Sequence, residues 1–179
     1  MAFFEKQLES KTIYNGAILT LKCDKVELDD GTTAYRELVE NNGGVCVLAF
    51  DENEKVLLVK QYRYALGREM LELPAGKIDK GEDPAEAAKR ELEEETGYIC
   101  GELIPLGVFN PSVAYLREKM YMYAAVNNKP SKQKLDEGEF LSVERMSLQE
   151  LVENIMNEKI TDGKTCIAAL KYKILKAEE

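Results

Sequence analysis

Three glutamates of one predicted helix, Glu91, Glu94 and Glu95, have the spacing expected of a site for a hard metal ion. Their separations place all three within about 100° of one another around a helix, so the carboxylates share one face. Like charges this close destabilise a helix and need a compensating cation. Magnesium and manganese favour carboxylate oxygens clustered on a rigid element, whereas an isolated acidic run is more often a solvated surface.

The composition limits the other chemistry available to the chain. The 179 residues include no histidine, which excludes Ser-His-Asp and Cys-His catalysis and leaves acid and base work to carboxylates, lysine, tyrosine or metal-bound water. The net charge of −9 repels nucleic acid and anionic membranes, so we expect neither as a partner. An anionic substrate must therefore be met by local cations or by metal ions.

Cysteine usage and hydropathy indicate a cytoplasmic protein. The four cysteines lie far apart without a CxxC pair, which is typical of reduced thiols and not of a disulfide framework or a zinc site. The first residues, MAFFEKQLESK, contain no apolar core of a secretory signal, and no uncharged apolar stretch is long enough for a transmembrane helix.

The helix that carries the glutamates is predicted from Pro84 to Thr96. Asp83 can serve as its N-cap, and Pro84 suits the first helical position because its missing N–H is not needed there. Glu86 is expected to complete a capping box, and Gly97 to end the helix.

The remaining pattern predicts a mixed α/β or α+β fold. Residues 13–40 indicate two or three antiparallel strands with a turn at 29–31, which form a small sheet before the main domain. Two nearly continuous apolar runs follow, and they imply a sheet covered by helices on both faces. The runs are Val45–Phe50 and Lys55–Tyr64; later strands are expected at Leu103–Phe109, Met120–Val126 and Phe140–Arg145, and helices at Ser147–Asn157 and Lys164–Lys176.

The segment from Gly76 to Tyr98 contains a longer motif around the glutamates. Its fixed positions are Gly76, Glu82, Arg90, Glu91, Glu94, Glu95 and Gly97, with Tyr98 as a mild departure at the last apolar position. This is the Nudix box, and the chain resembles a Nudix hydrolase. Seven such identities would coincide by chance on the order of once per million chains. The resemblance implies an α/β/α sandwich with a mixed sheet.

The chemistry of the residue types suggests roles for Gly76 and Arg90, and the resemblance suggests roles for the glutamates. Gly76 is expected to permit a backbone turn, and Arg90 to pin carboxylates by bidentate hydrogen bonds as part of the catalytic machinery. By resemblance, Glu91 and Glu95, helped by Glu94, hold magnesium ions on a pyrophosphate, with manganese as a substitute. The backbone carbonyl of Ala75 is a further metal ligand by the same resemblance. Such ions neutralise substrate oxygens and lower the pKa of an attacking water.

Further segments resemble the ADP-ribose pyrophosphatase branch of the family. They are QYRYALGREMLELPAGKIDKGE, the Arg36-Glu37 pair, LDEGEF and TDGKT. The resemblance implies hydrolysis of ADP-ribose to AMP and ribose 5-phosphate, with Arg36 and Arg63 gripping the phosphates or the terminal ribose and Pro111 in the substrate loop. Each arginine could instead be an ordinary surface salt-bridge residue.

The LDEGEF segment supplies the remaining candidates by resemblance. Glu137 matches the branch's general base, and Glu139 matches an additional metal ligand; an ordinary acidic loop is the alternative. If Glu137 is not the base, Glu94 takes that role. The sequence leaves open which of these three glutamates removes the proton.

The loop at residues 110–118 departs from the branch, so other substrates and functions stay open. GDP-mannose or ADP-glucose is the alternative nucleoside diphosphate sugar. A catalytically silent nucleotide sensor is the alternative from another class, although the intact metal-binding glutamates argue against it.

The small N-terminal sheet lacks enough core to be stable alone, which predicts a homodimer. Residues 1–41 are expected to mediate dimerisation and contact substrate, and residues 42–179 to form the catalytic domain.

Overall fold

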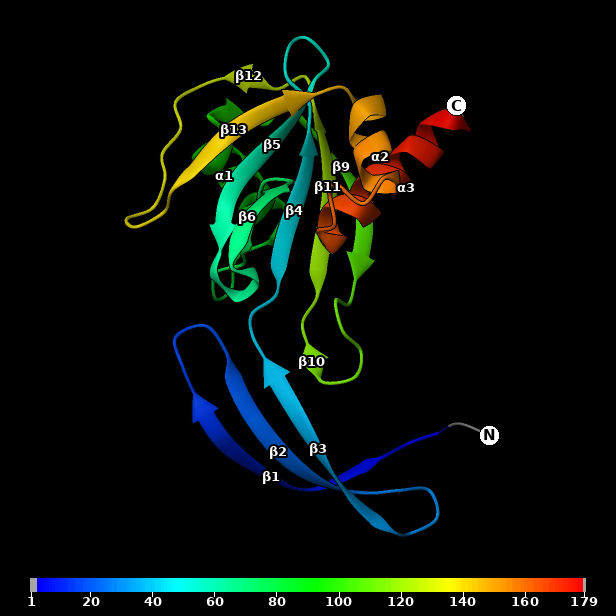
Figure 1. The fold of residues 1–179 in the computed structure, drawn as a ribbon. Helices are drawn as coiled ribbons and strands as arrows, with labels where there is room; N and C mark the ends of the chain where they lie inside the picture. Colours follow the sequence, from blue (N-terminus) through cyan, green and yellow to red (C-terminus); the bar gives the residue numbers. More distant parts are fainter. Residues whose placement is uncertain (1–2, 179) are drawn as a thin grey trace. The chain divides into compact units, whose positions relative to one another are not determined.

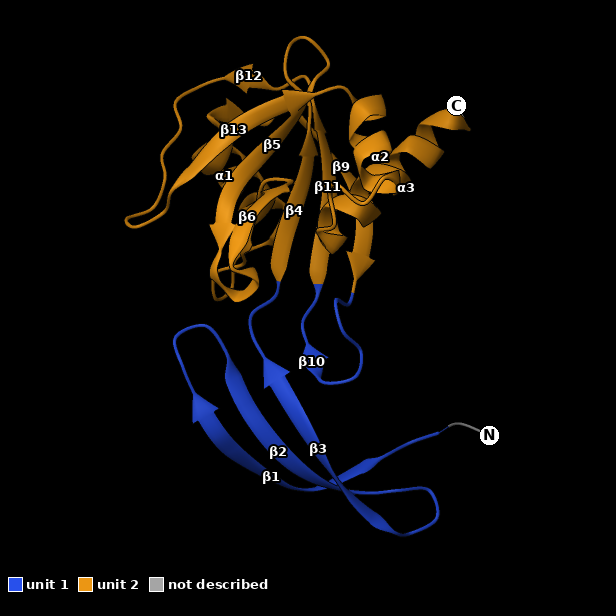
Figure 2. Cartoon of the chain, in the orientation of Figure 1, with its two compact units in different colours: residues 1–43, 110–119 blue, residues 44–109, 120–179 orange. Residues whose placement is uncertain are grey.

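The computed structural model describes residues 3–178 and divides the chain into two compact units (Figure 1). Unit 1 contains the chain up to Gly43 together with Asn110–Lys119, and unit 2 contains Gly44–Phe109 together with the residues from Met120 onward (Figure 2). The first unit is therefore built from two separate stretches of sequence.

Unit 1 is a four-stranded sheet in the order β1-β2-β3-β10. Strands β1 (Lys6–Asn15), β2 (Thr20–Glu27) and β3 (Thr33–Glu40) are antiparallel neighbours, and the short β10 (Leu116–Arg117) pairs parallel to β3. The predicted antiparallel arrangement is confirmed, but the predicted start at residue 13 is wrong, because β1 begins at Lys6. The predicted turn between β2 and β3 is confirmed, with Gly31 at φ 81°. Every residue of β1 is exposed within this chain, so the sheet has little core of its own.

Unit 2 contains the mixed sheet of the main domain. Its first sheet has the order β7-β4-β11-β9, in which β4 and β11 are parallel and the outer pairs are antiparallel. A second, antiparallel sheet has the order β13-β5-β6. The strands are β4 (Gly44–Ala49), β5 (Val56–Arg63), β6 (Arg68–Glu72), β7 (Ala75–Lys77), β9 (Glu102–Phe109), β11 (Met120–Val126) and β13 (Leu141–Met146), with the short pair β8 (Tyr98–Ile99) and β12 (Lys129–Pro130) and a 3-10 turn η1 (Tyr64–Leu66).

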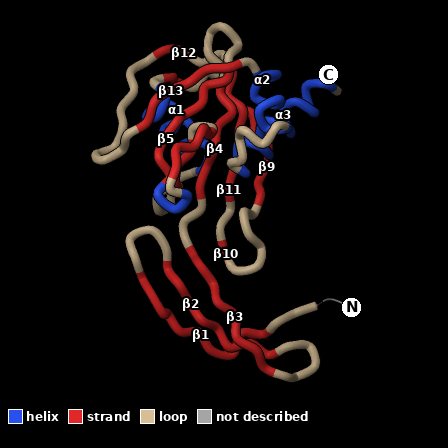
Figure 3. Tube along the Cα trace, viewed as in Figure 1, coloured by secondary structure: helices blue, strands red, loops and turns tan. Residues whose placement is uncertain are grey.

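Helices cover this strand layer on both sides (Figure 3). Alternate residues of β4 belong to two different cores because successive side chains of a strand point to opposite faces. Leu48 packs in the core that includes Leu151 of α2 (Leu148–Met156) and Ala168 of α3 (Gly163–Ala177). Val47 packs in the core that includes Leu92 of α1 (Pro84–Thr96). The predicted α/β/α sandwich is thus confirmed.

Helix α1 has the predicted boundaries. The Asp83 carboxylate accepts the N–H groups of Ala85 at 2.8 Å and Glu86 at 3.3 Å, and Gly97 closes the helix at φ 72°. The expected capping box is wrong, because the Glu86 carboxylate bonds Lys89 at 2.8 Å. Asp83 therefore caps the helix without help from Glu86. Within residues 3–178, no helix is long and apolar enough to cross a membrane.

Candidate active site

Glu95 is the most buried acidic group of α1. Its residue is 2% exposed, and its Oε2 accepts the backbone N–H of Ala75, the first residue of β7, at 2.8 Å. Burial raises the pKa of Glu95 to about 8; the Ala75 bond opposes this, and the nearby charges of Glu91 and Glu139 reinforce it. The Glu95 carboxylate is therefore buried beside other negative charges, where a positively charged partner would stabilise its ionised form.

Glu91 occupies space that is open only because residue 76 is a glycine. A Cβ atom added to Gly76 would lie 2.0 Å from the Cδ and Oε1 atoms of Glu91. The expectation that Gly76 makes a turn is wrong: it lies inside β7, paired with Val45 of β4, and its φ is not positive. Burial also raises the pKa of Glu91, although Arg90 pulls it the other way.

Arg90 is the hub of the acidic cluster. Its Nε and Nη2 atoms bond the two carboxylate oxygens of Glu82 at 2.9 and 3.0 Å, which is the predicted bidentate contact. Its Nη1 atom bonds Glu91 at 2.8 Å and Glu94 at 2.9 Å, and Nη2 also reaches the Lys77 carbonyl. The bond to Glu82 and the other acidic contacts raise the pKa of Arg90, so it stays a cation.

The loop that carries LDEGEF is fastened to the C-terminal end of α1. The Gln133 side-chain amide donates to the Glu95 carbonyl at 2.6 Å, and the Lys134 N–H donates to the Glu94 carbonyl at 3.0 Å. The Ser131 N–H donates to the carbonyl of Gly97 at 2.6 Å. The last carbonyls of a helix lack partners within the helix, and this loop supplies them. No local signal in the sequence indicates this anchor.

The loop brings Glu139 to the cluster and leaves Glu137 exposed. A tight turn is closed by the Glu139 N–H on the Asp136 carbonyl at 3.0 Å, with Gly138 at φ 83°. The charge of Glu139 acts on both Glu91 and Glu95. Glu137 is exposed at the turn and bonds no other residue in the described part of the chain. Its role as a base stays a prediction.

The three candidate substrate residues lie in different units. Arg63, at the end of β5, bonds Glu72 in bidentate fashion, and its charge also acts on Glu95. Arg36 belongs to unit 1, where its Nε and Nη2 atoms bond the carboxylate of Glu5 at 2.9 and 2.6 Å. Pro111 also belongs to unit 1 and is exposed. Within unit 2, Arg63 is thus the candidate substrate residue whose charge acts on the acidic cluster.

The donor set fits a hard divalent cation. Glu91, Glu95 and Glu139 offer oxygen ligands, and a cation among them would relieve both the burial penalty and the mutual repulsion. Among the described residues, no three acidic or cysteine side chains enclose an ion site as they stand. Arg90 bonds Glu91 in this arrangement, so it competes with a cation for that carboxylate.

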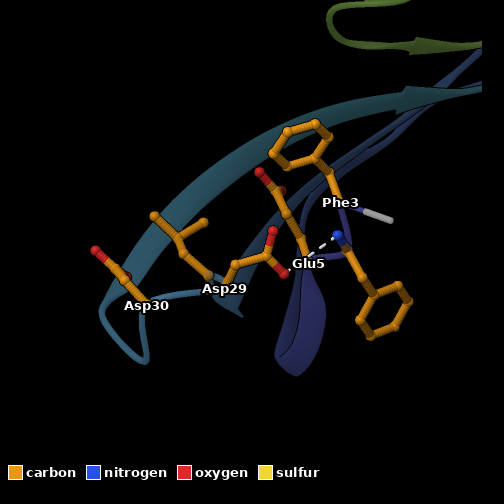
Figure 4. Close-up of a pocket in the computed structure, with 6 residues that line it drawn as sticks. Phe3, Glu5, Asp29 and Asp30 are labelled. Atoms are coloured by element: carbon orange, nitrogen blue, oxygen red, sulfur yellow. Dashed lines mark hydrogen bonds between the residues drawn. The ribbon is translucent and has the colours of Figure 1, made fainter. Parts of the chain in front are cut away.

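Two hollows elsewhere in the structure are lined by carboxylates, whose negative charge would repel an anionic substrate. One, of about 380 Å³ in unit 1, combines acidic side chains with aromatic ones (Figure 4). The other, of about 490 Å³ in unit 2, also has several carboxylates in its wall. The first is lined by Phe3, Phe4, Glu5, Leu28, Asp29 and Asp30, and the second by Phe50, Asp51, Glu52, Glu54, Val126, Asn127, Asn128 and Tyr172. Neither hollow provides an arginine or lysine for a phosphate.

Comparison with known proteins gives consistent family matches. Residues 40–166 match the NUDIX domain model, and residues 5–39 match the nucleoside diphosphate sugar hydrolase N-terminal domain. The chain is 39% identical to the methanol dehydrogenase activator of Bacillus methanolicus, over 96% of this chain and 98% of the relative. It is 36% identical to the ADP-ribose pyrophosphatase of Bacillus subtilis, over 96% of this chain and 94% of the relative.

A solved structure supports the fold. The crystal structure of an ADP compounds hydrolase superposes with a TM-score of 0.86 and covers 97% of this chain and 95% of its own. The sequence identity is 23%, so this likeness concerns the fold alone.

Replacing Gly76 by Ala tests whether this glycine makes room for Glu91. The added Cβ must displace the Glu91 carboxylate, so we expect the affinity for Mn²⁺ to fall by about tenfold or more while the fold is kept. Calorimetric titration with Mn²⁺ measures the affinity, and circular dichroism checks the fold. Gly163→Ala is the matched control, because nothing lies within 4 Å of its Cβ position. Unchanged Mn²⁺ affinity in Gly76→Ala would contradict the assignment.

Proposed function

Because the chain belongs to the Nudix hydrolase family, we propose that it hydrolyses the pyrophosphate bond of ADP-ribose to AMP and ribose 5-phosphate with the help of Mg²⁺. Nudix hydrolases generally use divalent metal ions. The observation that carries the proposal is the buried Glu95 beside the half-buried Glu91, with the charge of Glu139 acting on both. A sensor that only binds a nucleotide would not need such a cluster.

In this proposal Glu91, Glu95, Glu139 and the carbonyl of Ala75 hold the metal ions. Bound Mg²⁺, or Mn²⁺ in its place, neutralises the pyrophosphate oxygens and lowers the pKa of the attacking water. Arg90 keeps the carboxylates of Glu91 and Glu94 in place through one hydrogen bond to each, and is itself held by two bonds to Glu82.

Other residues of the chain bind the substrate and move the proton. Arg63, and Arg36 from unit 1, grip the phosphates or the terminal ribose, and Pro111 belongs to the substrate loop. Glu137 takes the proton of the attacking water, and Glu94 is the alternative base. The oxygen of that water forms a bond to one phosphorus, the bridging P–O bond breaks, and the bridging oxygen leaves with the other phosphate. No covalent enzyme intermediate is required.

A product screen tests the substrate assignment. ADP-ribose, GDP-mannose, ADP-glucose, dinucleoside polyphosphates and NADH are each incubated with the protein and Mg²⁺ in ¹⁸O-labelled water, and the products are identified by mass spectrometry. We expect ADP-ribose to have the highest kcat/KM, and the label shows which phosphorus is attacked. A higher kcat/KM for GDP-mannose or ADP-glucose would establish the alternative substrate, and no turnover of any compound would support the sensor.

Replacing Glu95 by Gln keeps its shape and removes an anionic ligand. We expect Mg²⁺-dependent turnover to fall by roughly a hundredfold or more, as it does when a principal charge-stabilising group is lost. Glu86→Gln is the matched control, since Glu86 lies on the same helix and pairs only with Lys89 in the described structure. Turnover is compared from the initial rates of the wild type and both variants at saturating Mg²⁺. Nearly normal turnover in Glu95→Gln would reduce the cluster to a solvated acidic face.

The loop glutamates can be separated by their response to Mg²⁺. Glu137→Gln should lower kcat by roughly 10²- to 10⁴-fold with much less change in KM, because a general base acts in the transition state. Glu139→Gln should be partly rescued by excess Mg²⁺, since a lost ligand weakens metal binding. Kinetics over a range of Mg²⁺ concentrations distinguishes the two. If both variants are rescued equally, neither residue is the base and Glu94 becomes the candidate.

The exposed apolar side chains of unit 1 support a homodimer. They are Phe3, Phe4, Leu8, Ile13, Tyr14, Ile18, Leu19, Tyr35, Val113 and Tyr115. A sheet with so little core of its own gains stability by burying such residues against a second copy. In this proposal residues 1–41 mediate assembly and contact substrate, whereas residues 42–179 form the catalytic domain. We further propose a cytoplasmic protein, whose four cysteines are free thiols in the structure.

Sedimentation of the full-length protein tests the dimer. We expect twice the mass of one chain at micromolar concentration, and a shift toward the monomer in Ile13→Asp, which places a charge on the apolar surface of β1. Ser10→Asp is the control for an added charge on the same strand. A wild-type protein that sediments as a monomer would defeat the idea.

A further inference from the structure

Four charged side chains form an alternating chain that starts at Arg63. The Arg63 Nε and Nη2 atoms bond the two carboxylate oxygens of Glu72 at 2.7 and 2.6 Å. Lys164 bonds the Oε2 atom of the same carboxylate and also pairs with Asp162 at 3.0 Å. The chain of charges thus runs from the end of β5 through β6 to the start of α3.

The middle of this chain is buried. The Glu72 side chain is 3% exposed and the Lys164 side chain 11% exposed. Burial pushes the pKa of Glu72 upward, but the bonds from Arg63 and the charge of Lys164 outweigh it and hold the pKa below its usual value. Removing one partner of a buried ion pair leaves an uncompensated charge, so Glu72 depends on both of its cations.

The backbone around Lys164 is fixed as well. Asp162 caps α3 by accepting the N–H of Thr165 at 3.1 Å, and it also accepts the Thr165 hydroxyl at 2.5 Å. The Thr165 hydroxyl oxygen in turn accepts the N–H of Leu73, the residue after Glu72, at 2.8 Å. Two residues further on, the Ala75 N–H bonds Glu95. These hydrogen bonds connect the segment that carries Glu72 both to the start of α3, which carries Lys164, and to Glu95 of α1.

Arg63 is the exposed end of the chain of charges. Its side chain is 40% exposed, and Glu72 occupies only its Nε and Nη2 atoms. In the described part of the chain, no acceptor bonds its Nη1 group. The charge of Arg63 also acts on Glu95, so the guanidinium lies near the acidic cluster. Arginine with a free N–H edge is suited to a phosphate oxygen.

We propose that Lys164 is a positioning residue for Arg63. Lys164 shares the Glu72 carboxylate with Arg63 and neutralises it, so part of the Arg63 charge and its free N–H edge stay available to a phosphate of the substrate. The four groups are together neutral with Lys164 and carry one negative charge without it, which would repel an anion. This inference rests on the proposed hydrolysis of a nucleoside diphosphate.

The variant Lys164→Met removes the charge and keeps most of the side-chain volume. We expect KM for ADP-ribose to rise by about tenfold with kcat changed less than about threefold, because the effect acts on anion binding. Lys60→Met is the matched control: Lys60 lies on the same strand as Arg63 but pairs with Glu69 at 2.8 Å, outside this network. Its KM and kcat should stay within about twofold of the wild type.

A double-mutant cycle separates positioning from general stability. In an Arg63→Ala background, Lys164→Met should change KM by less than about twofold, since Lys164 acts through Arg63. Lys164→Arg, which keeps the cation, should restore most of the wild-type KM. If circular dichroism shows that Lys164→Met is unfolded, Lys164→Gln replaces it in the cycle.

The outcomes are distinct. A wild-type protein that hydrolyses none of the compounds screened would remove the proposed function itself. An active wild type whose KM is unchanged by Lys164→Met, or is raised equally with and without Arg63, would overturn the positioning role. A KM in Lys164→Arg as high as in Lys164→Met would overturn it too.

Discussion

The site depends on the burial of the Glu95 carboxylate beside other negative charges. Its one hydrogen bond from the Ala75 N–H offsets only part of the burial penalty, as the raised pKa shows. The neighbouring residues also accommodate negative charge: Arg90 bonds Glu91 and Glu94, and Gly76 leaves space for the Glu91 carboxylate. A divalent cation bound among these carboxylates would offset both the burial penalty and their mutual repulsion.

Local signals in the sequence predicted the fold well. Helix α1 begins and ends where the Asp83, Pro84 and Gly97 signals place it, and the apolar runs of β4 and β5 correctly indicated a sheet buried on both faces. These features follow from periodicity and capping within a few residues. The short strands β6, β7, β8, β10 and β12 were not predicted, because their runs are too short to show a period.

Contacts between distant residues could not be read from the sequence. The motif placed Gly76 near the glutamates, but its purpose, space for the Glu91 carboxylate, is visible only once β7 lies against α1. Gln133 and Lys134 bond helix carbonyls about forty positions away, and Lys164 pairs with Glu72 across 92 positions. The TDGKT segment resembles the ADP-ribose pyrophosphatase branch, but no feature of the neighbouring sequence indicates that its lysine contacts β6. Glu137 and Glu139 have the same residue type, and only the structure distinguishes their surroundings.

The central claim, that the carboxylates of α1 and its attached loop form a divalent metal site, is tested most directly by anomalous diffraction. Crystals grown with Mn²⁺ and a non-hydrolysable methylene analogue of ADP-ribose would give an anomalous difference map recorded at the manganese edge. The account predicts manganese peaks between Glu91, Glu95 and Glu139, in contact with the analogue's phosphonate oxygens. Bound analogue with no manganese peak at these carboxylates, or with manganese only at other acidic surfaces such as that around Asp51, would contradict it.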